Sequence, residues 1–230
     1  MQRMLRCRMT GLVLAAAGAA AFAQSRYHWS TEGAGPYCRF DIGPAFFQEG
    51  KLTGFGGPAN ASVDYDVGFA ADTAFGYAFN KYLATDFEFG FLGSTINSVS
   101  GFGTYNSYLD NLPFIANVTF SYPIHRTLLV PYIGAGVGGS FTTFSTDGFG
   151  DTGTTVFGTE SDVVFAWQAF AGIRVNVNRD TSIGLGYRYL NTMDPTFSYP
   201  PGYPYSGPNW DVTFKGIQSH SVLFTFQFHF

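Results

Sequence analysis

Seven charged residues lie in segments where apolar and polar side chains alternate, and all seven fall on the polar side of the alternation. They are Arg39, Asp41, Asp72, Asp86, Glu88, Arg174 and Arg188. A strand directs successive side chains to opposite faces, so these charges should share one face, away from the apolar side chains. Because an isolated charge out of water is costly, we expect Arg39 and Arg174 to pair with nearby carboxylates, namely Asp41, Asp86 and Glu88.

Nucleophilic catalysis would require a serine beside a histidine, and His220 lies between Ser219 and Ser221. Adjacent residues of a strand point to opposite faces, so neither serine should share a face with that imidazole. The other histidines, His28, His125 and His229, have no spacing typical of metal ligands. The sequence therefore predicts no catalytic triad, no metal site and no cofactor.

These side chains must be positioned by strands, because the dominant period of the sequence is two. In one segment Phe87 and Phe89 alternate with Asp86 and Glu88. Eight such segments cover residues 37–47, 67–79, 83–93, 112–122, 128–141, 163–177, 181–190 and 217–230. They recur without a linker-like break, so we expect one all-β domain over residues 37–230.

The first 23 residues are typical of a secretory signal peptide. Three arginines precede an apolar run from Gly11 to Ala20, and Ala21 and Ala23 supply a small-x-small cleavage site. This run is too short for a membrane helix, which needs roughly 20 residues. We expect an exported chain with a short periplasmic segment at residues 24–36. Cys38 would then be the only cysteine, without a disulfide partner.

Composition separates a membrane barrel from a soluble one. Aromatic residues make up 19% of the chain and charged residues only 12%, whereas about a quarter of the residues of a soluble protein are charged. The polar faces carry Gly, Ala, Asn and Gln instead of many Lys and Glu, which suits a narrow interior. A closed ring satisfies all backbone groups in lipid, and eight strands leave an interior that side chains just fill. We predict an eight-stranded antiparallel up-and-down transmembrane β-barrel whose phenylalanines face lipid.

The connections between the segments alternate in length. Short turns are expected around residues 80–82, 123–126 and 178–180, and long polar loops at residues 48–66, 94–111, 142–162 and 191–216. Short periplasmic turns and long extracellular loops are typical of outer-membrane barrels. An even number of strands then places both termini in the periplasm.

With the signal peptide, the eight segments and the Gly-rich stretch from Tyr132 to Gly138, the chain resembles the OmpA-like/opacity-type outer-membrane β-barrel superfamily. The resemblance implies a bacterial outer-membrane location with lipid as a partner. It also implies that the terminal residues Phe226, Phe228 and Phe230 form the signal read by the barrel-assembly machinery.

The last long loop concentrates rigid aromatic side chains among prolines. Its aromatic residues, which we take as candidates for surface recognition, are Phe197, Tyr199, Tyr203, Tyr205 and Trp210. Such side chains bind partners or sugars at low entropic cost. They are also typical of the aromatic belt at the lipid headgroups, and packing onto the barrel rim remains the alternative.

Charge narrows the choice of partner. Removing the three signal arginines from 12 Lys and Arg leaves nine basic against 16 acidic residues, a formal charge of −7, which disfavours a nucleic-acid partner. We predict a non-enzymatic outer-membrane protein with a structural role, or an adhesive one through a surface, host or matrix ligand. A narrow porin-like channel lined by the inward charges is the alternative, and a lipid-modifying outer-membrane enzyme is the third.

Overall fold

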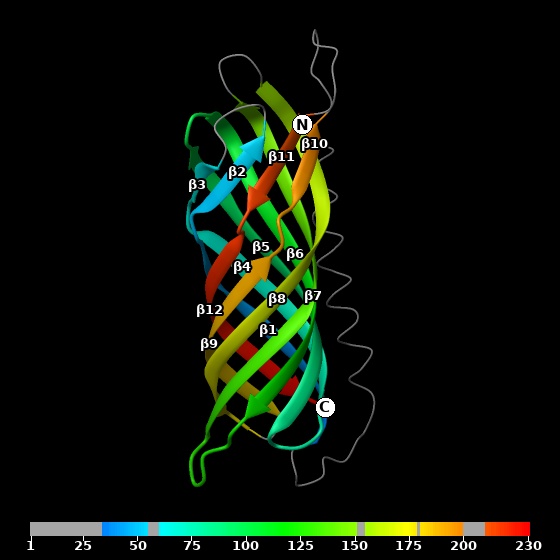
Figure 1. The fold of residues 1–230 in the computed structure, drawn as a ribbon. Coiled ribbons are helices and arrows are strands. Elements are labelled where there is room, and N and C mark those ends of the chain that lie inside the picture. The colour runs from blue at the N-terminus through cyan, green and yellow to red at the C-terminus, as the bar shows by residue number, and fades with distance from the viewer. Residues whose placement is uncertain (1–33, 55–59, 151–154, 179, 200–209) are drawn as a thin grey trace, which may run out of the picture.

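The chain forms a long, slender β-barrel, seen from the side in Figure 1. The computed structural model describes residues 34–54, 60–150, 155–178, 180–199 and 210–230. The expected signal peptide at residues 1–23 lies outside these ranges and stays a prediction. Within them, no helix has the length and hydropathy needed to cross a bilayer.

Twelve strands are described, all paired antiparallel. In chain order they are β1 (Gly35–Phe47), β2 (Gly50–Gly54), β3 (Ala61–Tyr65), β4 (Gly68–Ala78), β5 (Leu83–Val99), β6 (Gly103–Ser121), β7 (Leu129–Gly150), β8 (Thr155–Asn176), β9 (Thr181–Thr192), β10 (Thr196–Tyr199), β11 (Trp210–Lys215) and β12 (Gln218–His229).

Eight of these strands close a ring, as the alternation predicts. Its order is β1, β4, β5, β6, β7, β8, β9 and β12, and the first and last pair with each other over nine registered positions, from Tyr37 with His229 to Phe47 with Ser219. All eight predicted segments are confirmed as ring strands. Closure leaves no strand edge unpaired in the ring, as lipid surroundings require.

The prediction of four long loops is wrong for much of their length. The long segments continue the barrel upward as strands: β5 to β8 run on well above the ring, and β2, β3, β10 and β11 join them. β3 pairs with β5, β2 with β3, and β11 lies between β2 and β10. We call this upper part, in which β10 lies beside β8 in Figure 1, the extension.

Side-chain polarity inverts where the ring gives way to the extension, and β7 shows the change most clearly. Its outward residues pass from exposed Phe141 to Thr143 and Ser145, while its inward residues pass from Thr142 to fully buried Phe144. No residue is inserted, so the strand keeps its alternation. Below this point the outer surface is apolar and the interior polar; above it the arrangement is that of a water-soluble barrel.

The apolar outer band has the height of a bilayer core. On β7 it runs from Leu129 to Phe141, both exposed. Thirteen residues at about 3.3 Å each, tilted by roughly 40°, give a height of about 30 Å. The outward direction is thus confirmed for most phenylalanines of the ring: Phe89 is 52% exposed, whereas neighbouring Glu88 is 2% exposed. Phe170 is an exception, because it is 9% exposed and its ring faces Arg39 in the lumen.

The close approach of β1 to β12 provides a test of ring closure. A Cβ atom on Gly43 would lie 1.9 Å from the backbone oxygen of Val222, whereas one on Gly103 would meet nothing nearer than 3.7 Å. We expect Gly43→Ala to cost about 1–3 kcal/mol of folding free energy, because backbone must move. The measurement is the temperature at which the compact band on an unboiled gel converts to the unfolded band. That temperature should fall for Gly43→Ala and stay unchanged for Gly103→Ala; equal behaviour would contradict the packing described.

Candidate functional site

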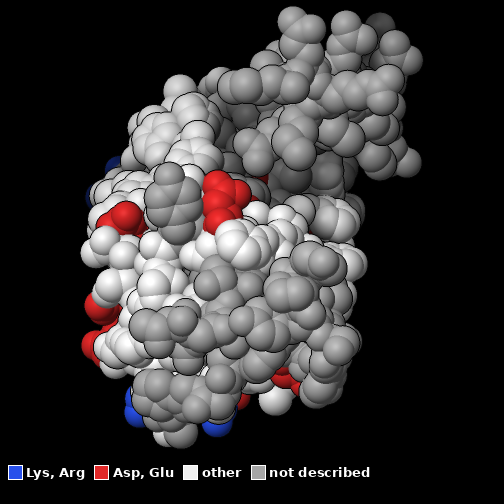
Figure 2. All heavy atoms as spheres, turned by 90° about the horizontal axis from the view of Figure 1, so that it is seen from above, with Lys and Arg blue, Asp and Glu red and all other residues white. Residues whose placement is uncertain are grey.

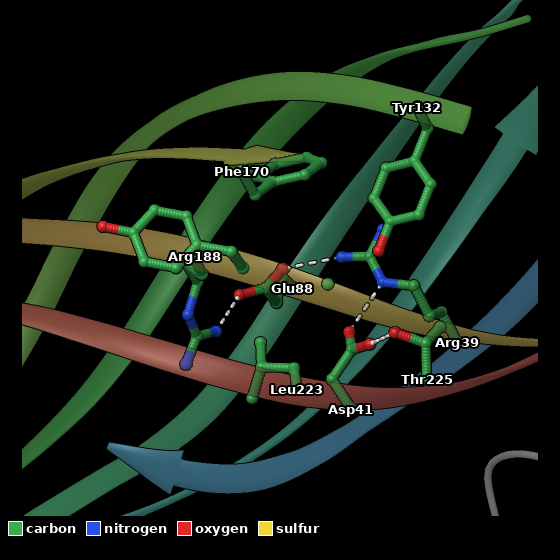
Figure 3. A pocket seen from close by; sticks show the side chains of 10 residues that line it. Arg39, Asp41, Glu88, Tyr132, Phe170, Arg188, Leu223 and Thr225 are labelled. Carbon is green, nitrogen blue, oxygen red and sulfur yellow. Dashed lines mark hydrogen bonds and ion pairs between the residues drawn. The ribbon is translucent and has the colours of Figure 1, made fainter. Parts of the chain in front are cut away.

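Arg39, on β1, is the centre of the polar interior. Its guanidinium donates from Nε to Asp41 Oδ2 at 2.7 Å, from Nη1 to Asp86 Oδ2 at 2.9 Å and from Nη2 to Glu88 Oε2 at 2.7 Å. Figure 3 shows it between the ring of Tyr132 and the carboxylates. All three acids are buried. One arginine therefore joins the closing strand β1 to β5 across the lumen.

Arg188, on β9, provides the second positive charge. Its Nη1 donates to Asp72 Oδ2 at 2.7 Å and to Glu88 Oε1 at 3.0 Å. Glu88 accepts from Arg39 through one oxygen and from Arg188 through the other. The two arginines are thus linked through a single carboxylate in the middle of the lumen, as Figure 3 shows.

Neutral side chains complete the network. Tyr37 donates to Asp86 at 2.6 Å, Thr225 donates to Asp41 at 2.5 Å, and Asn117 donates to Asp86 at 2.8 Å. Gln168 reaches Asn117 at 2.9 Å. These residues were not predicted as members of the network, although the alternation places them on the inner face. The sequence does not show which group an uncharged polar side chain will bind.

The expected pairing of Arg174 with carboxylates is wrong. Its guanidinium donates to Ser121 at 2.7 Å and to Gln227, and it lies 4.9 Å from the centre of the Tyr132 ring. Within the described ranges, no carboxylate oxygen comes within 4.0 Å of it. Arg174 lies nearer the lower end of the barrel than Arg39 does, and hydroxyl, amide and aromatic groups surround it there. The carboxylates expected to pair with it bind Arg39 instead. The other six predicted lumen charges do form one network.

Above the network, the lumen becomes apolar in two steps. A first cluster fills the top of the ring: Ala45, Ala70, Leu92, Ile115, Ala166, Leu190 and Leu223. A second fills the extension: Leu52, Ala61, Val63, Ile96, Val99, Leu109, Phe144, Phe197, Tyr199, Val212, Phe214 and Ile217. Aromatic rings pack closely there, with Phe144 and Phe214 at 5.1 Å between centroids. The interior is therefore filled at two levels, by the network of charged side chains in the ring and by packed apolar side chains above it.

Two of the five candidate recognition residues belong to that second cluster. Phe197 is 1% exposed and Tyr199 2% exposed, so neither side chain is available at the surface, which corrects the sequence-based assignment for these two. The phenol of Tyr199 donates to the backbone oxygen of Phe144 at 2.9 Å, and burial raises the pKa of this phenol. Tyr203 and Tyr205 lie outside the described residues. Of Trp210 only the backbone is described, paired with Tyr199.

His220 does not meet a serine. It lies on the outer face, where it contacts the hydroxyl of Tyr187 and, at 2.7 Å, Gln48, while Ser219 and Ser221 are buried on the inner face. Among the described residues, no group of three or more His, Cys, Asp or Glu is placed to hold a metal ion. The opposite orientation of His220 and its neighbouring serines agrees with the sequence analysis.

An outward aromatic belt surrounds His220 at the top of the apolar band. Tyr189 lies 5.2 Å from the His220 ring and 5.4 Å from Trp167, measured between ring centroids. Such amphipathic rings are typical of the lipid headgroup level. His220 is near the upper end of β12. Near the lower end of β12, Phe226 and Phe228 point outward, and Phe230, the next residue after the strand, is partly buried. Their assignment as an assembly signal stays a prediction.

Comparison with known proteins places these features in context. Residues 10–230 match the family model described as outer membrane protein beta-barrel domain. No curated protein sequence matches significantly. Among solved structures, the outer membrane protein OprG from Pseudomonas aeruginosa is similar at 14% identity and a TM-score of 0.61, covering 86% of this chain and 97% of that one.

Two further structures share the fold. Outer membrane protein AlkL in lipid bilayers is 18% identical with a TM-score of 0.51, over 90% of this chain and 96% of that one. Neisserial surface protein A is 18% identical with a TM-score of 0.50, over 86% of this chain and all of that one. At these identities the likeness concerns the fold alone.

The network predicts a large penalty for removing Arg39. In Arg39→Gln three buried carboxylates lose their shared partner, and breaking such a buried pair costs about 3–5 kcal/mol. We expect a marked fall in the temperature of gel conversion. Arg126→Gln, in an exposed lower turn, is the matched control and should leave that temperature unchanged. A stable Arg39→Gln barrel would show that the ion network does not hold the ring together.

Proposed function

The chain belongs to the outer membrane protein beta-barrel domain family and thus to the bacterial outer membrane; from this premise we propose that it is a non-enzymatic structural barrel that displays a surface for adhesion. The observation that carries the proposal is the doubly closed lumen. The Arg39 and Arg188 network fills the ring, and the apolar clusters fill the space above it. A barrel that is filled in this way has little room for solute, so its exposed outer surface is what remains for function.

The extension gives this surface its orientation and rigidity. Its outer face is polar and its interior apolar, as in a barrel surrounded by water, so we place it outside the cell. Short turns and the C-terminus lie at the opposite end in Figure 1, which supports a periplasmic position for that end. Cross-strand hydroxyl pairs cover the outside of the extension, such as Thr143 with Ser161 at 3.0 Å and Thr196 with Thr213 at 2.9 Å.

The hairpin between β10 and β11 is the best candidate for contact with a surface ligand. Residues 200–209, which connect the two strands, contain Tyr203 and Tyr205. Because Phe197 and Tyr199 anchor β10 in the core of the extension, the connection starts from a fixed base. A rigid base lowers the entropic cost of binding through the segment it carries.

One observation favours the alternative, a narrow channel. A small space remains beside the network in Figure 3, lined by residues that include Arg39, Glu88 and Arg188. Within the described chain, Nε and Nη2 of Arg188 have no hydrogen-bond acceptor although they are buried. Polar groups of this kind can bind water, and a hydrated route would have to cross the apolar clusters above to reach the outside.

Conductance in planar bilayers separates the two functions. We expect no resolvable openings for the wild-type barrel, because packed side chains close the lumen, while a reference porin in the same bilayer confirms detection. Ala166→Leu adds bulk to the lower apolar cluster. Wild-type openings that disappear in folded Ala166→Leu would establish the channel and refute the closed barrel.

Adhesion is tested by shortening one hairpin. Tyr199 and Trp210 are Cα partners, so Asn-Gly can replace residues 200–209 as a two-residue turn. We expect cells that display this variant to lose binding to an immobilised extracellular-matrix preparation. The temperature of gel conversion should stay unchanged, which would show that the barrel still folds. The matched control replaces residues 151–154 with Asn-Gly between the partners Gly150 and Thr155. Undiminished binding after the first replacement would exclude this hairpin as the contact.

A further inference from the structure

Two of the three lysines of the chain, Lys51 and Lys215, lie directly opposite each other. Lys51 is on β2 and Lys215 on β11, strands that run side by side in the upper half of Figure 1. Their strand neighbours Leu52 and Phe214 are buried in the extension, so both lysines point outward, and both are exposed. Opposed residues of this kind have Cβ atoms about 5 Å apart, and like charges there repel.

Nothing in the described part of the chain neutralises this pair at contact distance. No Asp or Glu oxygen lies within 4.0 Å of either ammonium group there. Three carboxylates near these strands accept hydrogen bonds from other groups: Asp211 from Ser198 at 2.6 Å, Asp64 from Ser98 at 2.9 Å, and Asp194, between β9 and β10, from the Gly216 amide at 3.1 Å. The pair is thus arranged to meet an anion from outside the chain.

The lysine pair lies in a part of the barrel where the other described charged side chains are acidic. Viewed from above in Figure 2, acidic atoms are spread around the upper end and basic atoms show only at the edge. The described arginines are elsewhere: Arg39, Arg174 and Arg188 are in the lumen, and Arg126 is in a lower turn. Within the described ranges, Lys51 and Lys215 are therefore the basic groups of the extension.

The height of the pair selects the kind of anion. Lys51 is five positions along the chain from exposed Phe46, and Lys215 is five positions from His220 in the aromatic belt. At about 3.3 Å per residue and a tilt of roughly 40°, both lysines start about 12 Å above the apolar band. Lysine stems extend back toward a bilayer surface, and the headgroup layer is roughly 6 Å thick. The ammonium groups thus reach the headgroups of the adjacent leaflet.

The hydrogen-bonding groups below the lysines suit the same ligand. Gln48, His220 and Tyr187 form a continuous polar contact on the outer face, directly above the apolar band. Amide, imidazole and hydroxyl groups can bind the oxygens of a headgroup while Tyr189 and Trp167 pack against its acyl chains.

We propose that Lys51 and Lys215 form a binding site for the phosphate of a membrane lipid headgroup on the outer wall of the barrel. Two opposed ammonium groups can hold one phosphate between them, which replaces their repulsion by two charge-assisted hydrogen bonds. The site anchors lipid to the seam where β1 and β12 continue into β2 and β11. It is independent of whether the barrel adheres or conducts.

The test is a lipid titration of the purified full chain in detergent micelles, read by native mass spectrometry. The probes are short-chain phosphatidic acid, phosphatidylcholine of the same chain length, and inorganic phosphate. We expect wild type to bind phosphatidic acid about twenty-five-fold more tightly than Lys51→Gln/Lys215→Gln, which is about five-fold for each lysine removed. Wild type should also prefer phosphatidic acid to phosphatidylcholine, and the double variant should lose this preference.

Two variants control for charge and folding. Lys81→Gln removes the remaining lysine, which is exposed in a lower turn beside Tyr82, and should keep the wild-type affinity. Lys51→Arg/Lys215→Arg keeps the charges and should keep most of the binding. Equal affinity of wild type and the glutamine double variant would overturn the proposal, as would equal loss in Lys81→Gln. Displacement of phosphatidic acid by an equal concentration of inorganic phosphate would reassign the site to free phosphate and overturn the lipid assignment.

Discussion

Four carboxylates buried inside an eight-stranded ring are costly unless positive charges meet them there, and the rest of this structure depends on how that condition is satisfied. Arg39 contacts three of the acids, Arg188 contacts Asp72, and Glu88 joins the two arginines. The pairs connect β1, β4, β5 and β9, which do not all neighbour one another in the sheet. The interior thus braces the ring across its width, in addition to the backbone ladders around it.

The barrel is suited to both hydrocarbon and water because the polarity of its outer and inner faces changes along its length. Where hydrocarbon surrounds the barrel, apolar rings face outward and charges are enclosed. Where water surrounds it, hydroxyls face outward and Phe144, Phe197 and Phe214 are enclosed. The inversion along β7 takes place between Phe141 and Thr143 without any break in register. Strand geometry can therefore continue through the boundary, and only residue type has to change.

This inversion also determines what the barrel offers to its surroundings. Both interiors are filled, so exchange through the lumen would need rearrangement of packed side chains. The outer wall offers three distinct zones: an apolar band, an aromatic belt around His220, and a hydroxyl-rich face above it that carries Lys51 and Lys215. These zones follow one another in height along one packed barrel. The extension holds the upper zone at a fixed distance from the bilayer, because its core is packed.

The sequence alone determined the parts of the structure that depend on local periodicity. Alternation placed all eight ring strands, the outward phenylalanines and the inward face of Arg39, Glu88 and Arg188, because side-chain direction in a strand follows from position parity. The signs of the charges also indicated that they would pair. The alternation placed all seven charges on the inner face, and six of them form one network in the structure.

Only the tertiary structure decided which partners meet and where strands stop. Arg174 binds Ser121 and Gln227 instead of a carboxylate, because the register between strands sets its height in the lumen. Composition rich in Gly, Ser and Thr suggested loops above the ring, yet these residues form strands whose apolar partners, such as Phe197 and Tyr199, bury one another across the barrel. Burial of that kind arises from residues far apart in the chain, and no local pattern of polarity specifies it.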